Sequence, residues 1–505
     1  MHDKYRLGLV RIEYSSGDPE MYVMPMGFAT GDPARSFRAE NPDAVIADVR
    51  GPGGAQGLLF TPIQVPEFAS AILDAFARRR RFNGEKGTII AARNREFRKL
   101  WGSTHPNLEP SLLAASEVNT SIKFGDRFVF KLLRQVEPGP HPGVEMGRYL
   151  TEEMTPPFPN AAPFAGYLQY QPSDLSAPTV VGVLHGFVPN DGTCWADTRK
   201  SLDQVFELAR ESKVTNVELQ NSAPTNIFKL KFALADPPPI AKEILGPYIE
   251  FYENIGRRVA QLHLALERNT ADPAFTPEPF NDFYRQGLFH GYIALLGRRL
   301  EFIRQRYSDM SPDVRLLAAK VLERENAILD KLRAVFAQRI SSERTRFHGR
   351  LHLGHLLVTG NDVVIFDFEG DPHQHVSERR IKRSPIRDVT SMLVSMGYAV
   401  QTALRHVTSA EGEIAGSRHS MRMWARFWYS HISAAFLRGY WKSAKGAPFL
   451  PRTEPDQETL LTTYLMERAL LDIRADIEDK PELAGMPFRV ILYLLDSEAE
   501  RKLGE

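Results

Sequence analysis

The chain has 505 residues, of which 43% are hydrophobic and 25% charged, and its 63 basic and 62 acidic side chains nearly cancel. This composition is typical of a globular protein with two or three packed units and excludes a disordered or fibrous chain. A near-neutral chain lacks the broad attraction that nucleic acid or an anionic membrane requires, so we expect neither as a partner. The single cysteine, Cys194, excludes a disulfide framework and fits a reducing compartment.

The N-terminal part has the pattern of β-structure. From Tyr5 to Ala29 apolar and polar residues alternate around a turn at Ser16-Gly17-Asp18-Pro19, which predicts a hairpin or meander. Residues 65–80 change to helical spacing. After a boundary marked by glycine and proline at 101–110, residues 117–131 predict two short strands around Gly125-Asp126.

The later part of the chain is mainly helical. Prolines at 138–142 break the chain, residues 144–152 resume as a helix, and 179–188 form a continuous apolar run typical of an interior strand. Ser311-Pro312 has the capping residue and first-turn proline that begin a helix. No apolar run is long enough to span a bilayer and no signal peptide is evident, so we expect a cytoplasmic location. Ile255, Val259, Leu262 and Leu266 recur at the spacing of one helix face, which predicts another helix there.

The residues with the clearest chemistry lie in a late β insertion. The loop from His348 to His355 precedes an apolar strand that ends in Asp367-Phe368-Glu369-Gly370. A polar loop followed by such a hairpin is how kinases place metal ligands beside a transferred phosphoryl group. Upstream, Lys131 lies in a predicted strand and Glu145 at the start of a helix, where a pair between them would hold the lysine against phosphates.

With these motifs in place, the chain resembles the maltokinase family, which is related in fold to aminoglycoside phosphotransferases, over nearly its whole length. The most specific match is Asp367-Phe368-Glu369-Gly370-Asp371-Pro372 with Ser384-Pro385-Ile386-Arg387-Asp388-Val389. The resemblance implies an α+β, bilobal protein-kinase-like fold. Its parts would be an N-terminal β-rich cap (1–105), an ATP-binding lobe (106–190) and a mainly helical C-terminal lobe (191–505).

The resemblance also implies ATP-dependent phosphorylation of maltose, or a related sugar, to maltose 1-phosphate in trehalose and glycogen metabolism. A trehalose synthase would be a possible partner. Lys131, Glu145 and Phe187 would bind ATP, with Phe187 in the hinge between the lobes. Asp367, Glu369 and His355 would hold Mg²⁺ or Mn²⁺. Trp424 and Tyr440 would form an aromatic wall for the sugar, although aromatic residues at helical spacing are more often core.

The chain departs from the family pattern at the catalytic loop. Arg350 stands where the family has the catalytic aspartate, and His355 where it has an amide ligand of the metal. Arginine cannot accept a proton at physiological pH. Three interpretations of Arg350 follow. The protein would be a slow maltokinase that relies on positioning and metal electrostatics, or a nucleotide-binding pseudokinase that regulates a trehalose or glucan enzyme. In the third, it is a kinase whose substrate has an anionic group that Arg350 binds.

Overall fold

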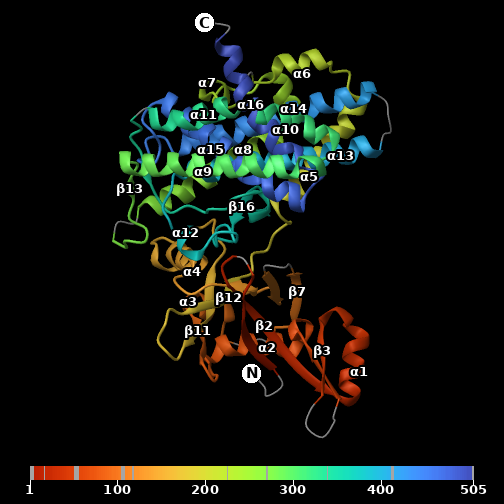
Figure 1. The fold of residues 1–505 in the computed structure, drawn as a ribbon, viewed down its shortest axis with the longest axis vertical. Coiled ribbons are helices and arrows are strands. Elements are labelled where there is room, and N and C mark those ends of the chain that lie inside the picture. Colours follow the sequence, from red (N-terminus) through yellow and green to blue (C-terminus); the bar gives the residue numbers. More distant parts are fainter. Residues whose placement is uncertain are drawn as a thin grey trace. The chain divides into compact units, whose positions relative to one another are not determined.

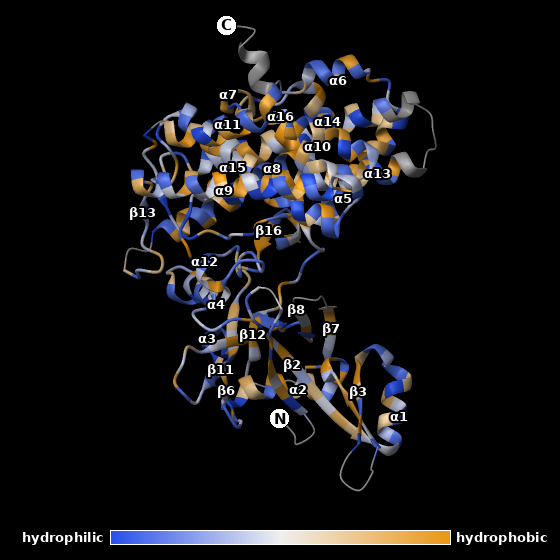
Figure 2. Cartoon of the chain, in the orientation of Figure 1, coloured by the Kyte–Doolittle hydropathy of each residue, from blue (hydrophilic) through white to orange (hydrophobic). Residues whose placement is uncertain are grey.

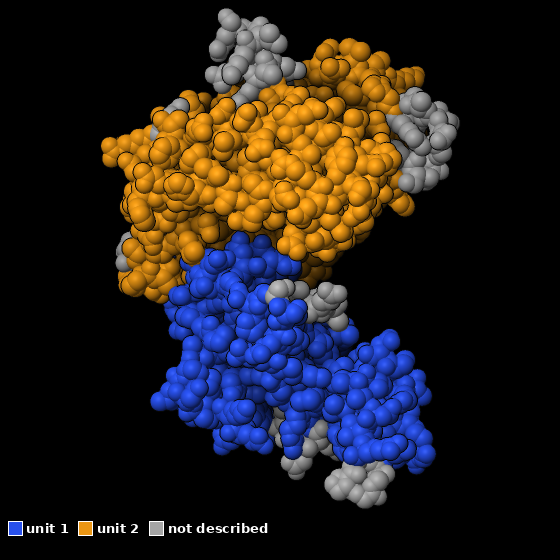
Figure 3. Space-filling view, viewed as in Figure 1, with its two compact units in different colours: residues 1–189, 366–380 blue, residues 190–365, 381–505 orange. Residues whose placement is uncertain are grey.

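The computed structural model describes residues 5–15, 17–50, 56–103, 108–115, 119–224, 226–268, 271–337, 339–410 and 415–502. The predicted turn residue Ser16, the predicted strand residues Glu117 and Val118, and the predicted boundary at 105 and 106 lie outside them. The chain folds into two compact units (Figure 3). Unit 1 comprises Met1–Pro189 with Phe366–Arg380, and unit 2 comprises Asn190–Ile365 with Ile381–Glu505.

Unit 1 contains two antiparallel sheets (Figure 1). The five-stranded sheet has the order β1 (Tyr5–Ile12), β2 (Glu20–Thr30), β4 (Gln56–Phe60) and β3 (Val45–Arg50), with β10 (Gln135–Val136) also paired to β2. The predicted hairpin is confirmed, because Tyr5 pairs with Gly27 and Ile12 with Glu20.

The seven-stranded sheet of unit 1 has the order β5 (Arg81–Asn83), β6 (Gly87–Arg93), β11 (Phe164–Pro172), β12 (Thr179–Gly186), β9 (Phe128–Leu133), β8 (Asn119–Phe124) and β7 (Pro110–Ala115). Because β6 pairs with β11 and β10 pairs with β2, strands from both sides of residue 105 share the sheets. Residue 105 therefore does not separate the two sheets, and the cap subdomain of residues 1–105 stays a prediction. The helices of unit 1 are α1 (Gly31–Glu40), α2 (Pro66–Arg78), α3 (Arg95–Trp101), α4 (Pro142–Arg148) and α12 (Val376–Arg379).

Unit 2 is mainly helical, and its helices carry both hydrophobic and hydrophilic residues (Figure 2). Two short hairpins, β13 (Glu278–Pro279) with β14 (Glu343–Arg344) and β15 (Leu356–Thr359) with β16 (Asp362–Ile365), complete it. The helices are α5 (Cys194–Glu211), α6 (Asn216–Ser222), α7 (Leu230–Ala233), α8 (Pro239–Glu267), α9 (Asp282–Arg306), α10 (Pro312–Leu322), α11 (Glu325–Ala337), α13 (Ile386–Ala410), α14 (Ala415–Ser443), α15 (Glu454–Asp479) and α16 (Gly485–Lys502).

Two glycines let α8 and α14 touch through their backbones. A Cβ at Gly256 would lie 2.0 Å from the carbonyl oxygen of Phe436, and one at Gly439 would lie 1.9 Å from that of Glu253. No larger residue fits either position without moving a helix, so these glycines fix the distance between α8 and α14.

Among the described residues, no helix has the length and apolarity that a bilayer span needs.

Candidate active site

Lys131 lies in β9, within the seven-stranded sheet. Pairing with Ser121 of β8 on one side and Val183 of β12 on the other fixes its backbone. Its neighbours Phe130 and Leu132 belong to the hydrophobic core of unit 1. Because side chains alternate across a strand, Lys131 projects from the other face of the sheet. Its side chain is only 15% exposed.

Two carboxylates meet the Lys131 ammonium group within unit 1. Its Nζ lies 2.7 Å from Oδ1 of Asp367 and 3.1 Å from Oε2 of Glu369. Asp367 has a φ of 68°, in the left-handed region that few non-glycine residues adopt, and Gly370 follows with a φ of 77°. Backbone held in a sparsely populated conformation is common at functional sites. This turn brings together the predicted residues Lys131, Asp367 and Glu369.

The charges of this cluster do not balance. Burial lowers the pKa of Lys131, but Asp367 and Glu369 outweigh burial and raise that pKa above its ordinary value, so the lysine stays charged. Burial raises the pKa of Glu369 above its ordinary value; Lys131 and, more weakly, Arg379 oppose this rise, and the nearby Asp367 adds to it. Two carboxylates therefore share one ammonium group.

The donor set of Asp367 and Glu369 fits a hard divalent cation. Carboxylate oxygens are preferred ligands of Mg²⁺, which usually takes one or two of them and completes its shell with water and substrate phosphates. In the described part of the chain, no group of three or more His, Cys, Asp and Glu residues is arranged to hold a metal. A cation at this pair would therefore need phosphate oxygens or water as further ligands.

Glu145 lies in α4 and pairs with Arg380, not with Lys131. Its two oxygens accept hydrogen bonds from Nε and Nη2 of Arg380, at 2.8 and 2.7 Å. This bidentate arrangement matches the planar fork of the guanidinium group. Where the sequence predicted a Lys131–Glu145 pair, Lys131 pairs with Asp367 and Glu369, and Glu145 pairs with Arg380.

Two histidines near the cluster were not predicted from the sequence. His141 precedes α4 and is 8% exposed, and its Nδ1 is buried without a hydrogen-bond partner among the described residues. Burial lowers the pKa of His141 to about 3 and that of His185 to about 4, so both are neutral at physiological pH. A Cβ at Gly143 would lie 3.0 Å from Cγ of Glu369 and 3.3 Å from Cε1 of His141. The glycine lets both side chains approach.

Phe187 follows β12 in unit 1. Its N–H donates to the carbonyl oxygen of Arg127 at 2.8 Å, and the ammonium group of Lys123 lies 4.2 Å from the centre of its ring. This backbone hydrogen bond holds the segment around Phe187, which lies two residues before the end of this stretch of unit 1 at Pro189. A role of Phe187 in nucleotide binding stays a prediction.

Arg350 lies in unit 2, in a loop that is held by its own backbone contacts. The N–H of Arg350 donates to Nδ1 of His348 at 3.3 Å, and its carbonyl oxygen accepts from Nδ1 of His355 at 2.9 Å. The N–H of Gly354 donates to Nδ1 of His352, whose ring centre lies 3.7 Å from that of His355. The loop is therefore a compact turn in which three imidazole rings support the backbone around Arg350.

The contact of His355 decides its tautomer. A carbonyl oxygen can only accept, so Nδ1 of His355 carries a proton and donates it to this bond. Metal-ligating histidines are commonly oriented by such a bond from the other ring nitrogen. The geometry agrees with both interpretations of His355, a ligand and a backbone support, and its metal role stays a prediction.

Asp388, near the start of α13, fixes the beginning of this loop and was assigned no role from the sequence. It is fully buried, and its two oxygens accept hydrogen bonds from the N–H groups of His348 at 2.7 Å and Gly349 at 3.0 Å. Nε2 of His263, in α8, lies 3.1 Å from Oδ2 of Asp388. Asp388 thus connects the loop to the helical core.

Tyr440 and Trp424 are core residues, which corrects the predicted aromatic wall. Tyr440 is 0% exposed and Trp424 is 1% exposed. The hydroxyl of Tyr440 lies 2.9 Å from Nδ1 of His263, so the tyrosine extends the buried chain of contacts that ends at Asp388. Helical spacing defines the face on which such residues lie, and here that face packs inside the helical unit.

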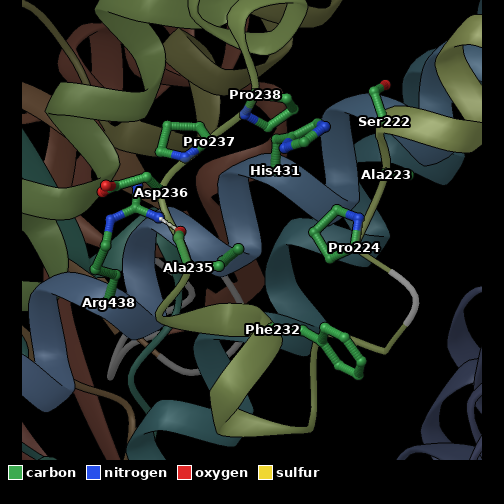
Figure 4. Close-up of a pocket in the computed structure, with 11 residues that line it drawn as sticks. Ser222, Ala223, Pro224, Phe232, Ala235, Asp236, Pro237, Pro238, His431 and Arg438 are labelled. Carbon is green, nitrogen blue, oxygen red and sulfur yellow. Dashed lines mark hydrogen bonds between the residues drawn. The ribbon is translucent and has the colours of Figure 1, made fainter.

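Unit 2 also contains a pocket that no sequence motif indicated (Figure 4). It has a volume of about 180 Å³ and lies between the segments around α6 and α7 and the helix α14. His431 and Arg438 line it, and both are 3% exposed. Arg438 is already paired with Glu253 and with the carbonyl oxygen of Ala235. Because these pairs occupy its guanidinium group, the pocket does not add to the charged site.

No protein-family model matches the chain. Among solved structures, the chain is similar to a glucosamine kinase in one crystal form, with a TM-score of 0.56 and 15% identity over 97% of this chain and 94% of that one. It is also similar to glucosamine kinase in complex with glucosamine, ADP and inorganic phosphate, with a TM-score of 0.53 and 16% identity over 97% and 94%. Likeness at this identity establishes the fold, and the predicted α+β kinase-like fold is confirmed.

Proposed function

We propose that this chain is an ATP-dependent phosphotransferase that phosphorylates a sugar hydroxyl, with maltose as the acceptor and maltose 1-phosphate as the product. The observation that carries the proposal is the cluster of Lys131, Asp367 and Glu369, in which a buried lysine and a strained acidic turn meet. The fold is shared with a glucosamine kinase whose complex contains glucosamine, ADP and inorganic phosphate. Maltose itself rests on the motifs that resemble maltokinases.

In this proposal each residue has a distinct task. Lys131 binds phosphate oxygens of ATP, and Asp367 with Glu369 holds a divalent cation. A bound Mg²⁺ would supply charge stabilisation for the transferred phosphoryl group. Asp388 keeps the loop around Arg350 in one conformation through two backbone N–H groups. Neutral His141 and His185 line the cluster without adding positive charge that would compete with the metal.

Arg350 changes how the acceptor hydroxyl loses its proton. Because a guanidinium group accepts no proton, the transfer relies on positioning and electrostatics, which carry most of the catalysis of phosphoryl transfer. Glu369 or Asp371 would then be the substitute acceptor of the proton. Arg350 itself would bind a phosphate oxygen or an anionic group of the substrate.

A second candidate function is that of a nucleotide-binding regulator without turnover. The observation in its favour is Arg350 at the position of the catalytic base, since a base contributes about 10²- to 10⁴-fold in rate. Such a protein would bind ATP and control a trehalose synthase or a glucan enzyme. The two candidates share the nucleotide site and differ in whether a phosphorylated sugar appears.

Nucleotide binding tests the part that both candidates share. The wild type should show an ATP-dependent rise in melting temperature with Mg²⁺ or Mn²⁺ present, because a ligand that binds the native state stabilises it. Lys131→Ala should lose this rise. The control is Lys99→Ala, which removes a lysine whose side chain is 77% exposed. A wild type that shows no shift would overturn the proposal.

A further inference from the structure

The loop that holds the arginine at the catalytic position is anchored to α13 at two points. At its start, the N–H groups of His348 and Gly349 donate to Oδ2 and Oδ1 of Asp388. Near its end, the N–H group of Leu353 donates to Oγ of Ser395 at 3.2 Å. Asp388 and Ser395 are seven residues apart in one helix, so they lie two turns apart on the same face. The arginine lies between these anchors, so its position depends on how firmly each anchor is held.

His263, in α8, holds the other side of the Asp388 anchor. Its Nε2 lies 3.1 Å from Oδ2 of Asp388, and a carboxylate can only accept, so the imidazole donates in this contact. Its Nδ1 lies 2.9 Å from the hydroxyl group of Tyr440, which can donate or accept and therefore pairs with either form of the ring. The carboxylate of Asp388 thus receives hydrogen bonds from the loop on one side and from α8 on the other.

Complete pairing distinguishes His263 from two other buried histidines. His263 is 0% exposed, and both of its ring nitrogens have a partner. By contrast, Nδ1 of His141 and Nε2 of His431 are buried, with no hydrogen-bond partner among the described residues. The ring of His263 also packs edge-on against the rings of Tyr440 and Phe449, with centres 5.6 and 6.0 Å away. A fully satisfied buried network is rigid, so the imidazole has one preferred orientation.

The helices that carry His263 and Tyr440 are themselves in close contact. α8 and α14 approach through their backbones at Gly256 and Gly439. Gly439 directly precedes Tyr440, so this contact sets the tyrosine against α8. The pair of helices therefore fixes where the imidazole donates, and the imidazole fixes the orientation of the Asp388 carboxylate.

We propose that His263 is a positioning residue for phosphoryl transfer, and that it acts through Asp388 on the loop of Arg350. The inference rests on the proposed function, to which it adds a residue outside the reacting groups. The ring of His263 is fully buried, so its effect reaches the loop through the carboxylate that it holds. Without the bond from α8, that carboxylate can turn and the loop can shift with it. A displacement of about 1 Å near the reacting groups can cost about 10²-fold in rate.

Two amide variants of the full chain separate the two ring nitrogens of His263. The amide nitrogen of His263→Gln reaches about as far as Nε2 and can still donate to Asp388. The amide nitrogen of His263→Asn reaches only about as far as Nδ1, on the side of Tyr440. The control is His431→Asn, which makes the same change at a histidine of α14 that is 3% exposed.

Kinetics and amide hydrogen exchange are measured in the wild type and the three variants. His263→Asn should lower kcat by about tenfold or more at saturating ATP and maltose, with ATP affinity unchanged. The amides of His348 and Gly349 should exchange faster in this variant, while that of Leu353 should not change, because Ser395 still holds it. His263→Gln and the control should stay close to the wild type in each quantity. If His263→Asn does not fold, His263→Phe, which keeps a ring and removes both nitrogens, takes its place.

The outcomes separate this inference from the proposed function. A fall in kcat that occurs in His263→Asn alone supports the inference. Equal kcat in the two His263 variants, or an equal fall in His431→Asn, overturns it. If the wild type forms no phosphorylated sugar, the proposed function fails and amide exchange alone decides. Faster exchange of His348 and Gly349 in His263→Asn than in His263→Gln then supports a positioning role, and equal exchange overturns it.

Discussion

Lys131 and Asp367 are 236 positions apart in the chain, yet Nζ of one lies 2.7 Å from Oδ1 of the other. The contact joins a strand of the seven-stranded sheet to a turn whose backbone is held in the left-handed region. Glu369 adds a second carboxylate to the same ammonium group. A buried lysine shared by two acids, one of them on a strained turn, is better explained by ligand binding than by stability, since a buried ion pair is weak evidence for stability.

The ion pair between Lys131 and Asp367 predicts that Asp367→Asn loses affinity for ATP. The amide keeps the shape of the side chain but removes one negative charge, so metal-dependent ATP binding should weaken by about tenfold or more. The strand that carries Lys131 should still fold into the sheet, because Glu369 can pair with the lysine. Calorimetric titration of ATP at several Mg²⁺ concentrations measures the effect. An affinity equal to that of the wild type would remove Asp367 from the metal site.

Arg350→Asp should raise maltose phosphorylation by about tenfold or more, because it would restore a group that can accept the proton of the acceptor hydroxyl. The measurement is the initial rate of phosphosugar formation at saturating ATP. A lower rate in the variant would mean that Arg350 makes a positive contribution, such as binding a phosphate or an anionic substrate.

His355→Gln should shift the metal preference of nucleotide binding from Mn²⁺ toward Mg²⁺ if the imidazole is a ligand, since imidazole suits later transition metals better than Mg²⁺. ATP affinity is measured with each metal in both proteins. An unchanged ratio of the two affinities would leave His355 as a support for the carbonyl oxygen of Arg350.

Asp388→Asn should lower the rate of phosphoryl transfer by about 10²-fold while ATP affinity is preserved. The amide has one acceptor oxygen, so it cannot hold the N–H groups of His348 and Gly349 as the carboxylate does. Comparing kcat with the affinity for ATP separates misplacement of the loop from unfolding. If kcat and the affinity for ATP fall by the same factor, Asp388 does not act by positioning the loop.

The stability of unit 2 should depend on pH through Asp476. Burial raises the pKa of this aspartate to about 7 from 3.8, and the side chain is 3% exposed. Below about pH 3 the carboxyl is largely protonated in both the folded and the unfolded chain. As pH rises from about 4 to 7 the unfolded chain ionises first, so the free energy of unfolding should fall across this window.

Asp476→Asn tests this dependence, because the amide imitates the protonated acid. The variant should be more stable than the wild type at pH 8, by at most about 4 kcal/mol, and about equally stable at about pH 3. Thermal denaturation at the two pH values measures the difference. If the melting temperatures of the variant and the wild type differ by the same amount at both pH values, the pH dependence does not come from Asp476.

The local elements and the acidic turn could be predicted from the sequence because each depends on neighbouring residues. Alternation defined β1 and β2, the Gly125-Asp126 turn indicated β9, Ser311 with Pro312 began α10, and the run before Asp367 gave β16. Each of these patterns is decided within about ten residues.

The partners of side chains across the fold could not be predicted in this way. Glu145 lies on the predicted helix, but Arg380, which captures it, is 235 positions away. Tyr440 has the spacing of a helix face, and only the packing of α8 against α14 decides that this face is buried. His141 and His185 become neutral through burial, which depends on the assembled sheet and helices.

The most direct test of the central claim is a phosphotransfer assay with the full chain, ATP, Mg²⁺ or Mn²⁺, and maltose, followed by detection of the sugar product. We expect ADP and maltose 1-phosphate in equal amounts, and no product from Asp367→Asn under the same conditions. ATP binding without any phosphorylated sugar, from maltose or glucosamine and with either metal, would contradict the sugar kinase and leave the nucleotide-binding regulator.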